Sequence, residues 1–578
     1  MARVDCVHIE NFRSISNQSL HLNEITAFVG YNNAGKTNFL RAIEWLLKPA
    51  SKLSEENFGS LSQNVVVIGK ISDISVEQWE KIEEKHQVKI GKFFVDNSIW
   101  VKRIASLGGD HKVDTFLAPG NQHLDKAKFE KNPTGISNAL AGLMPEMVHI
   151  SAMFDALTDT TKQKAGTTFS QLVTIALSVY AESFDEKTRT NFDNINEYFR
   201  KNEAITEISA GISKAFDQFF PGSSAAIGFA PIGVGDVLAK ALIQMRGEAE
   251  GEIRPAEAYG QGLQRSAQMA LIKYLADGNF GKENKKGVVL LIDEPELYLH
   301  PQMIAEISRS LVKMTKGEKS GFQVLMTTHS PMIIRNEDVI KNTYLVRKKH
   351  GITSVLQRRG NLEEIFSKHK TQYDIAVNLE NLSYSLFSET VLIAEGETEK
   401  ILLPQILKDL GGIDDRKLTV VMASSCFNIP GLKQVLRALG MRTIAVHDFD
   451  AMPNLPYENL TGWGEFSTAL EEFRQAKNYP AGPLGAKKIA VFIQDPANVK
   501  KAESLRTSLK DEGTWVWKNG DIEAVLYGEA IGASLKTQKA HDLLSAVKGK
   551  DWYQVIAEEG GNKDELMAFV DWVKHSIA

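Results

Sequence analysis

The chain has 578 residues, of which 43% are hydrophobic and 24% are charged, a composition typical of globular proteins with two or three domains. Its formal net charge of -5 excludes a general attraction to polyanions, so any surface that binds them must be a local basic patch. Two cysteines, Cys6 and Cys426, exclude a disulfide framework and a cysteine metal site. No stretch approaches the roughly 18 apolar residues of a membrane helix. We therefore expect a cytoplasmic protein without membrane contact.

The N-terminal part predicts two strands, at residues 4–12 and 20–29, which lead into a glycine-rich turn. The turn Gly30–Thr37 matches the pattern GxxxxGK[ST], and apolar residues at helical spacing follow it. Backbone amides of such a turn surround a phosphate, while Lys36 reaches the β- and γ-phosphates and the Thr37 hydroxyl binds Mg²⁺. The alternative is an ordinary glycine turn before a helix, but the order of strand, turn and helix favours the phosphate loop.

The middle of the chain predicts a change from strands to helices. From residue 154 to 222, apolar residues recur at helical spacing, which indicates a helical insertion. These helices complete the core or form an oligomer interface, and we favour the interface. Other elements predicted in this half are strands at 65–71, 99–104, 148–151 and 225–231, helices at 76–85 and 263–276, and a loop-rich segment at 108–131.

Two apolar runs that predict buried parallel strands end in polar residues. The run 288–292 ends on Asp293 and Glu294, and the run 322–326 is followed by His329. In an ATPase, Asp293 would serve Mg²⁺, Glu294 would orient or deprotonate water, and His329 would sense the γ-phosphate. An acidic pair also caps helices, and a lone histidine at a strand end is usually structural. The phosphate loop earlier in the chain favours the catalytic interpretation.

A second α/β pattern begins near residue 390. The strand 390–394 ends on Glu395, and Glu399 lies one helical turn further along the same face. A later strand ends on Asp448 and Asp450, which alternate so that one or both can reach the same cavity. Such oxygen ligands suit Mg²⁺ or Mn²⁺, and a pair of these ions could activate water and stabilise a leaving 3′-oxygen. Surface acids that cap helices are the alternative. The other strands predicted here are 418–422, 443–446 and 488–492.

The first group of motifs resembles the ABC-type ATPase heads of the SMC and RecF proteins. The matching segments are Ile9–Arg13, the phosphate loop, Asp293–Glu296 and Thr328–Pro331. In that family a signature loop of one subunit covers the nucleotide held by its twin, and Gly260–Ser266 is the counterpart here. The resemblance therefore implies that ATP joins two heads. Because no long heptad repeat separates the motifs, the chain is not a full SMC rod.

The second group, EGxxE followed by DxD, resembles the Toprim domain of topoisomerases, primases and certain nucleases. An ABC-type head followed by a Toprim domain is similar to the OLD (overcoming lysogenization defect) family of anti-phage nucleases over nearly the whole chain. Glu395 with Glu399, and Asp448 with Asp450, match the first and second Toprim motifs. The resemblance also implies a downstream acidic segment and a late lysine. The candidates for these are Asp521, Glu523 and Lys563.

The expected fold class is α/β, with an ABC-type head of the SMC and RecF kind, an inserted helical dimerisation region and a Toprim domain. The expected domains are residues 1–153 and 223–375 (head), 154–222 (helical insertion) and 385–578 (Toprim). The expected nucleotide contacts are Arg13, Gly30, Asn32, Asn33, Ala34, Gly35, Lys36, Thr37 and Gly262. The expected metal ligands are Thr37, Asp293, Glu395, Glu399, Asp448, Asp450, Asp521 and Glu523. The expected catalytic side chains are Glu294, His329, Glu395 and Lys563.

The leading hypothesis is an ATP-hydrolysing DNA endonuclease or nickase acting in anti-phage defence, with ATP and Mg²⁺ as cofactors and Mg²⁺ or Mn²⁺ at the nuclease site. The alternatives are a RecF-like or SMC-like DNA-binding ATPase with a non-cleaving Toprim domain and, less favoured, a topoisomerase or primase. Expected partners are DNA, further copies in a homodimer or higher even-numbered homo-oligomer, and a companion such as a helicase or a retron reverse transcriptase with its DNA. Five basic residues could bind DNA phosphates; the alternative is that they lie on a solvated surface without a binding role. They are Lys487, Lys488, Lys500, Lys501 and Arg506.

Overall fold

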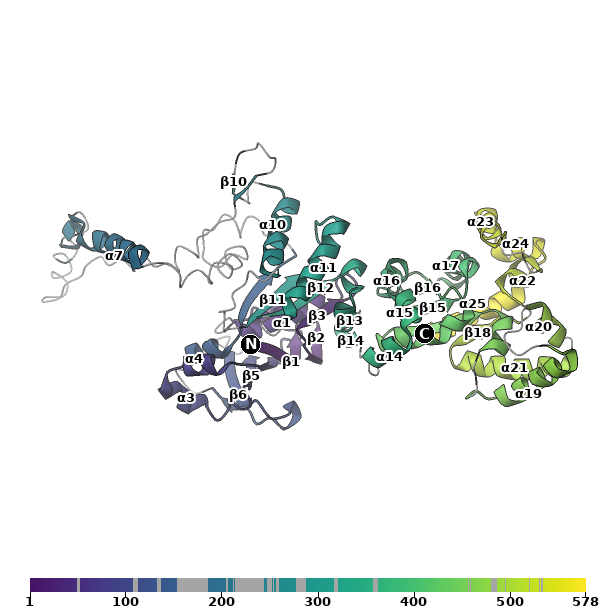
Figure 1. Cartoon of the computed structure of the whole chain (residues 1–578), viewed down its shortest axis with the longest axis horizontal. Coiled ribbons are helices and arrows are strands. Elements are labelled where there is room, and N and C mark those ends of the chain that lie inside the picture. The colour runs from purple at the N-terminus through teal and green to yellow at the C-terminus, as the bar shows by residue number, and fades with distance from the viewer. Residues whose placement is uncertain are drawn as a thin grey trace. The chain divides into compact units, whose positions relative to one another are not determined.

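The computed structural model describes residues 1–48, 52–107, 113–132, 137–152, 186–203, 206–210, 213, 244–246, 252, 254–255, 259–276, 287–316, 321–356, 362–455, 457, 459–479, 486–493, 495–518, 520–529, 531 and 534–577 (Figure 1). The chain divides into two compact units. The first comprises Met1–Phe28, Asn32–Thr343 and Lys348–Ser354, and the second Val29–Tyr31, Tyr344–Arg347 and Val355–Ala578. No helix in the described part is long and apolar enough to cross a membrane.

The first unit is built on a large mixed sheet. Within the described residues, its strand order is β7-β6-β5-β4-β1-β2-β14-β13-β3-β12-β11-β8. The strands from β7 to β2 pair antiparallel, whereas β12, β11 and β8 are parallel. Every residue of β11 and β12 is buried, which explains their unbroken apolar sequences. The bounds are β1 Arg3–Phe12, β2 Ile15–His21, β3 Ile25–Val29, β4 Val65–Ser72, β5 Ile99–Ala105, β6 Val113–Pro119, β7 Glu130–Lys131, β8 Glu146–Ile150, β11 Val288–Asp293, β12 Phe322–Thr328, β13 Thr343–Lys349 and β14 Ile352–Leu356.

Helix α1 (Lys36–Leu47) carries the phosphate loop onto this sheet. Its apolar residues fall on one face, which packs against β1, β4, β11 and β12. The ring of Phe39 stacks on that of Phe28 from β3, with 4.9 Å between centroids, so the strand and the helix that flank the loop are fixed together. Other elements of this unit are α2 Val76–Glu80, α3 Glu84–Ile90, α4 Ser137–Leu143, α7 Glu186–Lys201, β9 Gln244–Met245, β10 Arg254–Pro255, α10 Gln261–Tyr274, α11 Pro301–Thr315, α12 Pro331–Ile334 and α13 Glu337–Ile340.

Several elements of the first unit differ from the sequence prediction. The predicted strand 20–29 is the end of β2 and the whole of β3, separated by a turn in which the Asn23 amide donates to Thr26 Oγ1 at 3.0 Å. The helix predicted at 76–85 is two helices, α2 and α3. The segment predicted to be loop-rich contains β6, because pairing along all of β5 overrides its weak local signal. Helix α7 lies in the predicted helical insertion, but most of that insertion and the predicted strand 225–231 lie outside the described residues.

The second unit contains a smaller parallel sheet of order β16-β15-β17-β18 within the described residues. The prediction of a strand at 488–492 was wrong: this segment is helix α20, and Ile489 and Phe492 lie one turn apart in a buried cluster with Phe466. Its strands are β15 Thr390–Ala394, β16 Leu418–Met422, β17 Arg442–His447 and β18 Thr514–Val516. Its helices are α14 Leu362–Lys368, α15 Lys370–Ala376, α16 Leu379–Ser385, α17 Glu397–Gly411, α18 Ile429–Ala438, α19 Trp463–Lys477, α20 Ala486–Phe492, α21 Pro496–Asp511, α22 Ile522–Tyr527, α23 Lys536–Ala546, α24 Trp552–Glu558 and α25 Lys563–Ile577.

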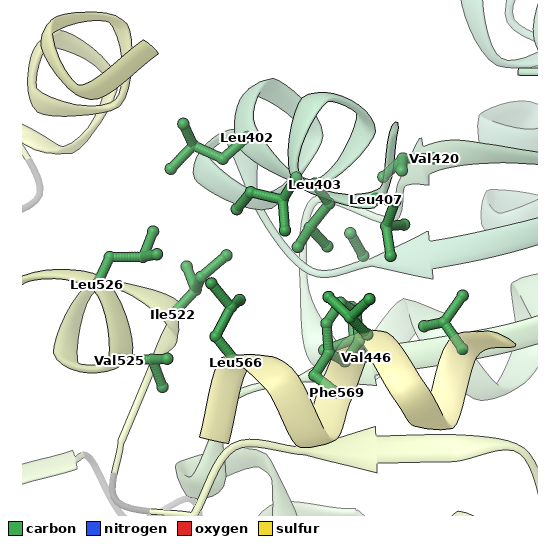
Figure 2. Packing of buried hydrophobic residues seen from close by; sticks show 14 of the residues in the cluster. Leu402, Leu403, Leu407, Val420, Val446, Ile522, Val525, Leu526, Leu566 and Phe569 are labelled. Carbon is green, nitrogen blue, oxygen red and sulfur yellow. The ribbon is translucent and has the colours of Figure 1, made fainter. Parts of the chain in front are cut away.

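An apolar core joins the sheet of the second unit to helices α17, α22, α23, α24 and α25. Figure 2 shows the leucines of α17 facing Leu566 and Phe569 of α25, with Ile522 and Leu526 of α22 beside them. All four of these residues are fully buried. Because Glu399 lies in the first turn of α17 and Glu523 in the first turn of α22, this packing fixes the positions of these acids relative to the sheet.

Candidate active sites

The phosphate loop has a backbone shape that requires glycine at its end. Gly35 caps α1 with φ 94°, and a Cβ at this position would lie 2.1 Å from Thr353 Oγ1. The Thr353 hydroxyl donates to the Ala34 carbonyl at 2.9 Å and so closes the back of the loop. Asn33 also has a positive φ, of 65°. A loop of this shape, ending at a helix N-terminus, fits a polyphosphate.

Threonine and aspartate meet beside this loop. Thr37 Oγ1 donates to the two carboxylate oxygens of Asp293 at 2.9 and 3.1 Å, and the hydroxyl of Thr327 also donates to this carboxylate. Lys36 is buried next to them, and burial lowers its pKa, against the opposing effect of Glu294 and Asp293. The donor set is a hydroxyl, a carboxylate and a cation next to a phosphate cradle, which is what Mg²⁺ with a nucleotide requires.

Glu294 follows Asp293 in an unusual backbone conformation. Its φ of 50° is left-handed, which costs a non-glycine residue about 1 kcal/mol or more. Its amide donates to the carbonyl and hydroxyl oxygens of Thr327, at 3.0 and 3.2 Å. The His329 ring lies 3.6 Å from Glu294 Oε1, lowering the pKa of Glu294, and the carboxylate in turn raises the pKa of His329. The structure therefore places the predicted water-orienting acid and γ-phosphate sensor side by side.

Glu296 is a third acid here, and the sequence analysis assigned it no role. Burial raises its pKa, and its Oε1 accepts hydrogen bonds from Thr328 Oγ1 and the His329 amide, both at 2.8 Å. The same oxygen lies 3.3 Å from His329 Nδ1. Glu296 thus fixes His329 from behind. The only signal in the sequence was its position two residues after Glu294.

Arg13 lies in a separate pocket of about 380 Å³ beside the loop. Asn38, which follows Thr37, donates to Ser14 Oγ at 2.8 Å and forms part of the pocket wall. Arg13 Nε donates to Asn57 Oδ1 at 2.9 Å. The pocket therefore lies next to the first turn of α1, which begins at the end of the phosphate loop.

Gly262, the predicted signature residue, lies in the first turn of α10. Its carbonyl accepts a hydrogen bond from Ser266 Oγ at 2.9 Å. On the same helix, Arg265 is 1% exposed and donates through Nη2 to the carbonyls of Asp293 and Glu294, at 3.0 and 2.9 Å. Arg265 had no predicted role, because a basic residue in a helical pattern gives no indication of such burial.

In the second unit, Glu395 and Asp448 come from neighbouring parallel strands. Glu395 directly follows β15 and Asp448 directly follows β17, and these strands pair with Ile393 opposite Ala445. Carboxyl ends of adjacent parallel strands meet at one edge of the sheet, where sites of α/β proteins form. Glu399 is buried in the first turn of α17, with Oε2 accepting from the Gly396 amide at 3.2 Å.

These acids repel one another. Burial raises the pKa of Asp448 well above its ordinary range, and the charges of Glu399 and Glu395 raise it further. Burial also raises the pKa of Glu399, to about 7. Within the described residues, Asp448 Oδ1 is buried and accepts no hydrogen bond. A divalent cation would neutralise this repulsion.

Among the described residues, no three side chains of the types Asp, Glu, His and Cys are arranged to hold a metal ion together. The side chain of Asp450 lies outside the described part.

Asp521 and Glu523 are neutralised by a lysine, which is Lys536. Its Nζ lies 3.0 Å from Asp521 Oδ2 and 2.9 Å from Glu523 Oε2. Burial alone would lower the pKa of Lys536, but these two hydrogen bonds raise it. Glu523 also accepts from Thr398 Oγ1, at 2.7 Å, beside Glu399. The predicted lysine, Lys563, is exposed at the start of α25.

Comparisons with known proteins match this arrangement. Residues 3–139 and 149–334 match the family model described as an AAA ATPase domain, and residues 386–450 match the one described as Overcoming lysogenization defect protein-like, TOPRIM domain. The chain is 30% identical to the Old nuclease of Escherichia phage P2, over 99% of this chain and 100% of that protein. The chain belongs to the OLD nuclease family.

More distant relatives of this OLD-family nuclease carry similar names. The Endonuclease GajA of Bacillus cereus (strain VD045) is 24% identical over 70% of this chain and 67% of its own. The OLD nuclease of Thermus scotoductus is 23% identical over 77% and 82%. Among solved structures, the SMC head domain from Thermotoga maritima covers 62% of this chain and 100% of its own, with 14% identity and a TM-score of 0.29. The predicted fold class, an ATPase head followed by a Toprim α/β domain, is confirmed, and the enzyme is an ATPase and an endonuclease.

The basic residues of the OLD-family nuclease that were candidates for binding phosphates differ in exposure. Lys500 is exposed on α21, and Lys488 lies over the ring of Tyr479, with 4.6 Å from Nζ to the centroid. Arg506 is buried and donates to the Val516 carbonyl and to Glu503. Because these bonds occupy its guanidinium, Arg506 has a structural role.

Proposed function

We propose that this OLD-family nuclease is a divalent-metal-dependent DNA endonuclease or nickase, acting against phage, with a separate site that binds and hydrolyses ATP. One observation supports the nuclease part: Glu395 and Asp448 lie at the ends of adjacent parallel strands, and no residue in the described part of the chain donates a hydrogen bond to the buried Asp448 Oδ1. DNA as the substrate and the defence role are supported by the family and by the names of its members.

Glu395, Glu399, Asp448 and Asp450 are the proposed ligands of Mg²⁺ or Mn²⁺ in the second unit. A bound ion there supplies a Lewis acid for the phosphodiester and a water of lowered pKa. Asp521 and Glu523 were predicted as metal ligands from the sequence, but both form ion pairs with Lys536. We therefore propose that they mainly hold this lysine beside Glu395, Glu399 and Asp448. A lysine ammonium in this position can stabilise charge on the scissile phosphate, a role for which Lys563 is the alternative.

The proposed ATP site is the phosphate loop together with the acids that follow β11. Amides of the loop that contains Gly30, Asn32, Asn33, Ala34 and Gly35 surround the phosphates, and Lys36 neutralises them. Thr37 and Asp293 are the proposed Mg²⁺ ligands. Glu294 orients water, His329 donates to the γ-phosphate, Arg13 contacts the nucleoside, and Gly262 contacts nucleotide held by a second copy of the chain.

The nuclease proposal is tested with supercoiled plasmid in Mg²⁺ or Mn²⁺. Wild type should nick or linearise the plasmid, whereas Glu395→Gln and Asp448→Asn should each lose at least about 100-fold in rate, as expected for groups essential to the chemistry. Glu471→Gln, which removes an exposed acid on α19 of the same unit, is the control and should cleave normally. Equal cleavage by wild type and Glu395→Gln, or DNA binding without any cleavage, would support a non-cleaving ATPase instead.

The defence role is tested by plaque formation on cells that express the protein. Wild type should reduce plaque numbers for at least one phage in a panel, and Lys36→Ala and Asp448→Asn should abolish the reduction. Copurification from the same cells tests the expected companion protein, and light scattering of the purified protein tests the expected even-numbered oligomer. Normal plaques with wild type for every phage would contradict the defence role.

A further inference from the structure

Arg265 is a buried arginine that donates hydrogen bonds to three main-chain carbonyls and one side chain. Through Nη2 it donates to the carbonyls of Asp293 and Glu294, and through Nη1 to the carbonyl of Ser151 at 3.3 Å and to Gln268 Oε1 at 3.2 Å. Burial lowers the pKa of Arg265 to about 10, while the nearby acids, including Glu294, oppose that effect. Such a buried cation is costly unless its bonds are made, so Arg265 is fixed where it lies.

These bonds act on the residue with the unusual backbone. Glu294 has a left-handed φ, and a strained residue keeps such a conformation only when its neighbours fix it from several sides. Thr327 of β12 holds the Glu294 amide, and Arg265 holds the Glu294 carbonyl. The direction of the Glu294 side chain therefore depends on a contact from α10.

The same helix also has an exposed side. Gln261 and Leu263 in its first turn are exposed, whereas Gln264, Arg265 and Gln268 are buried. The exposed start of α10 therefore lies within about one helical turn of the guanidinium that binds the Glu294 carbonyl.

We propose that Arg265 is a positioning residue for ATP hydrolysis, which sets the backbone of Glu294 and couples it to the exposed first turn of α10 in the same chain. This inference rests on the proposed role of Glu294. Arg265 contacts Asp293 only at its carbonyl and makes none of the contacts described above with the phosphate loop, so ATP binding should depend on it much less than turnover does. Loss of Arg265 should consequently affect turnover and leave the affinity for ATP nearly unchanged.

The test compares Arg265→Met and Arg265→Lys with wild type in steady-state ATP hydrolysis by the full chain. Arg265→Met should lower kcat at least about 10-fold with KM within about threefold, and Arg265→Lys should recover part of kcat because an ammonium can still donate to one carbonyl. Arg309→Met, which removes an arginine paired with Glu306 on α11, is the control and should keep both constants. A loss that falls on KM alone would overturn the inference.

A second measurement separates positioning from general destabilisation. The residual ATP hydrolysis of Glu294→Gln is followed with labelled ATP over long times. Adding Arg265→Lys to this variant should not lower the rate of hydrolysis further, because the effect of Arg265 passes through Glu294. If the two substitutions each reduce the rate of hydrolysis independently, so that their effects multiply, the inference is overturned. The Arg265→Lys variant allows this test even if Arg265→Met fails to fold. If Glu294→Gln hydrolyses ATP like wild type, the proposed role of Glu294 fails instead.

Discussion

Gly35 shows how one residue determines the shape of the phosphate loop. It combines a left-handed φ with a contact that leaves no room for a Cβ, since Thr353 Oγ1 and Ser14 Oγ would lie 2.1 and 2.9 Å from that atom. The sequence pattern identified Gly35 as part of a phosphate loop. It did not indicate the contact with Thr353, which lies more than 300 residues later in the chain and closes the back of the loop.

Gly35→Ala should therefore weaken ATP binding at least about 10-fold and lower the free energy of unfolding by about 1–3 kcal/mol, because strain and clash add. Fluorescent-nucleotide titration and denaturant unfolding measure the two effects. Gly142→Ala is a matched control: Gly142 lies in α4 with nothing within 4 Å of an added Cβ, so this change should leave binding intact. Normal nucleotide affinity of Gly35→Ala would show that the loop adapts.

At the scale of elements, the continuous apolar strands β11 and β15 were predicted correctly because burial on both faces leaves a strong local signal. Short apolar runs such as 488–492 fit a strand or a helix equally well, and packing against Phe466 decided for the helix. Lys536 and Arg265 could not be predicted, since their importance comes from where α23 and α10 fold and not from any local pattern.

Helix α1 is also joined to β8 by a partly buried hydrogen bond between side chains. Glu44 Oε2 accepts from His149 Nδ1 at 2.8 Å, and its other oxygen accepts from Lys48 Nζ at 2.6 Å. Burial alone would raise the pKa of Glu44, but these hydrogen bonds outweigh it and lower the pKa to about 2. The stabilisation is thus complete above the ordinary glutamate pKa, near 4.5, and is lost as the pH falls from there to about 2.

Glu44→Gln should consequently lower the free energy of unfolding at pH 7 by about 2 kcal/mol, and the difference from wild type should shrink as the pH falls below about 4.5. Urea unfolding followed by fluorescence at several pH values measures this. Glu84→Gln, at an exposed site on α3, should have little effect at any pH. A constant difference down to pH 2 would mean that the carboxylate charge is not what stabilises α1.

At the scale of the molecule, each unit has its own sheet, its own apolar core and its own candidate site. A ligand that binds only a folded site stabilises that fold by an amount set by its concentration relative to Kd, about 2.7 kcal/mol at a hundredfold excess. The two sites should therefore respond to different ligands.

In calorimetry, ATP with Mg²⁺ should raise the unfolding temperature of one transition, and this shift should disappear in Lys36→Ala. Mn²⁺ without nucleotide should raise a second transition, and that shift should disappear in Asp448→Asn. Each variant is the control for the other. The sites would not be independent if both ligands shifted the same unfolding transition and if either variant alone abolished both shifts.

The hydrogen bond between Thr37 and Asp293 joins residues 256 positions apart. During synthesis on the ribosome, the chain therefore displays its glycine-rich turn long before the carboxylate that completes it emerges. A nascent or truncated polypeptide that ends before β11 lacks this carboxylate. If Asp293 has the Mg²⁺-binding role proposed above, we expect no nucleotide turnover before the whole first half of the protein has been made.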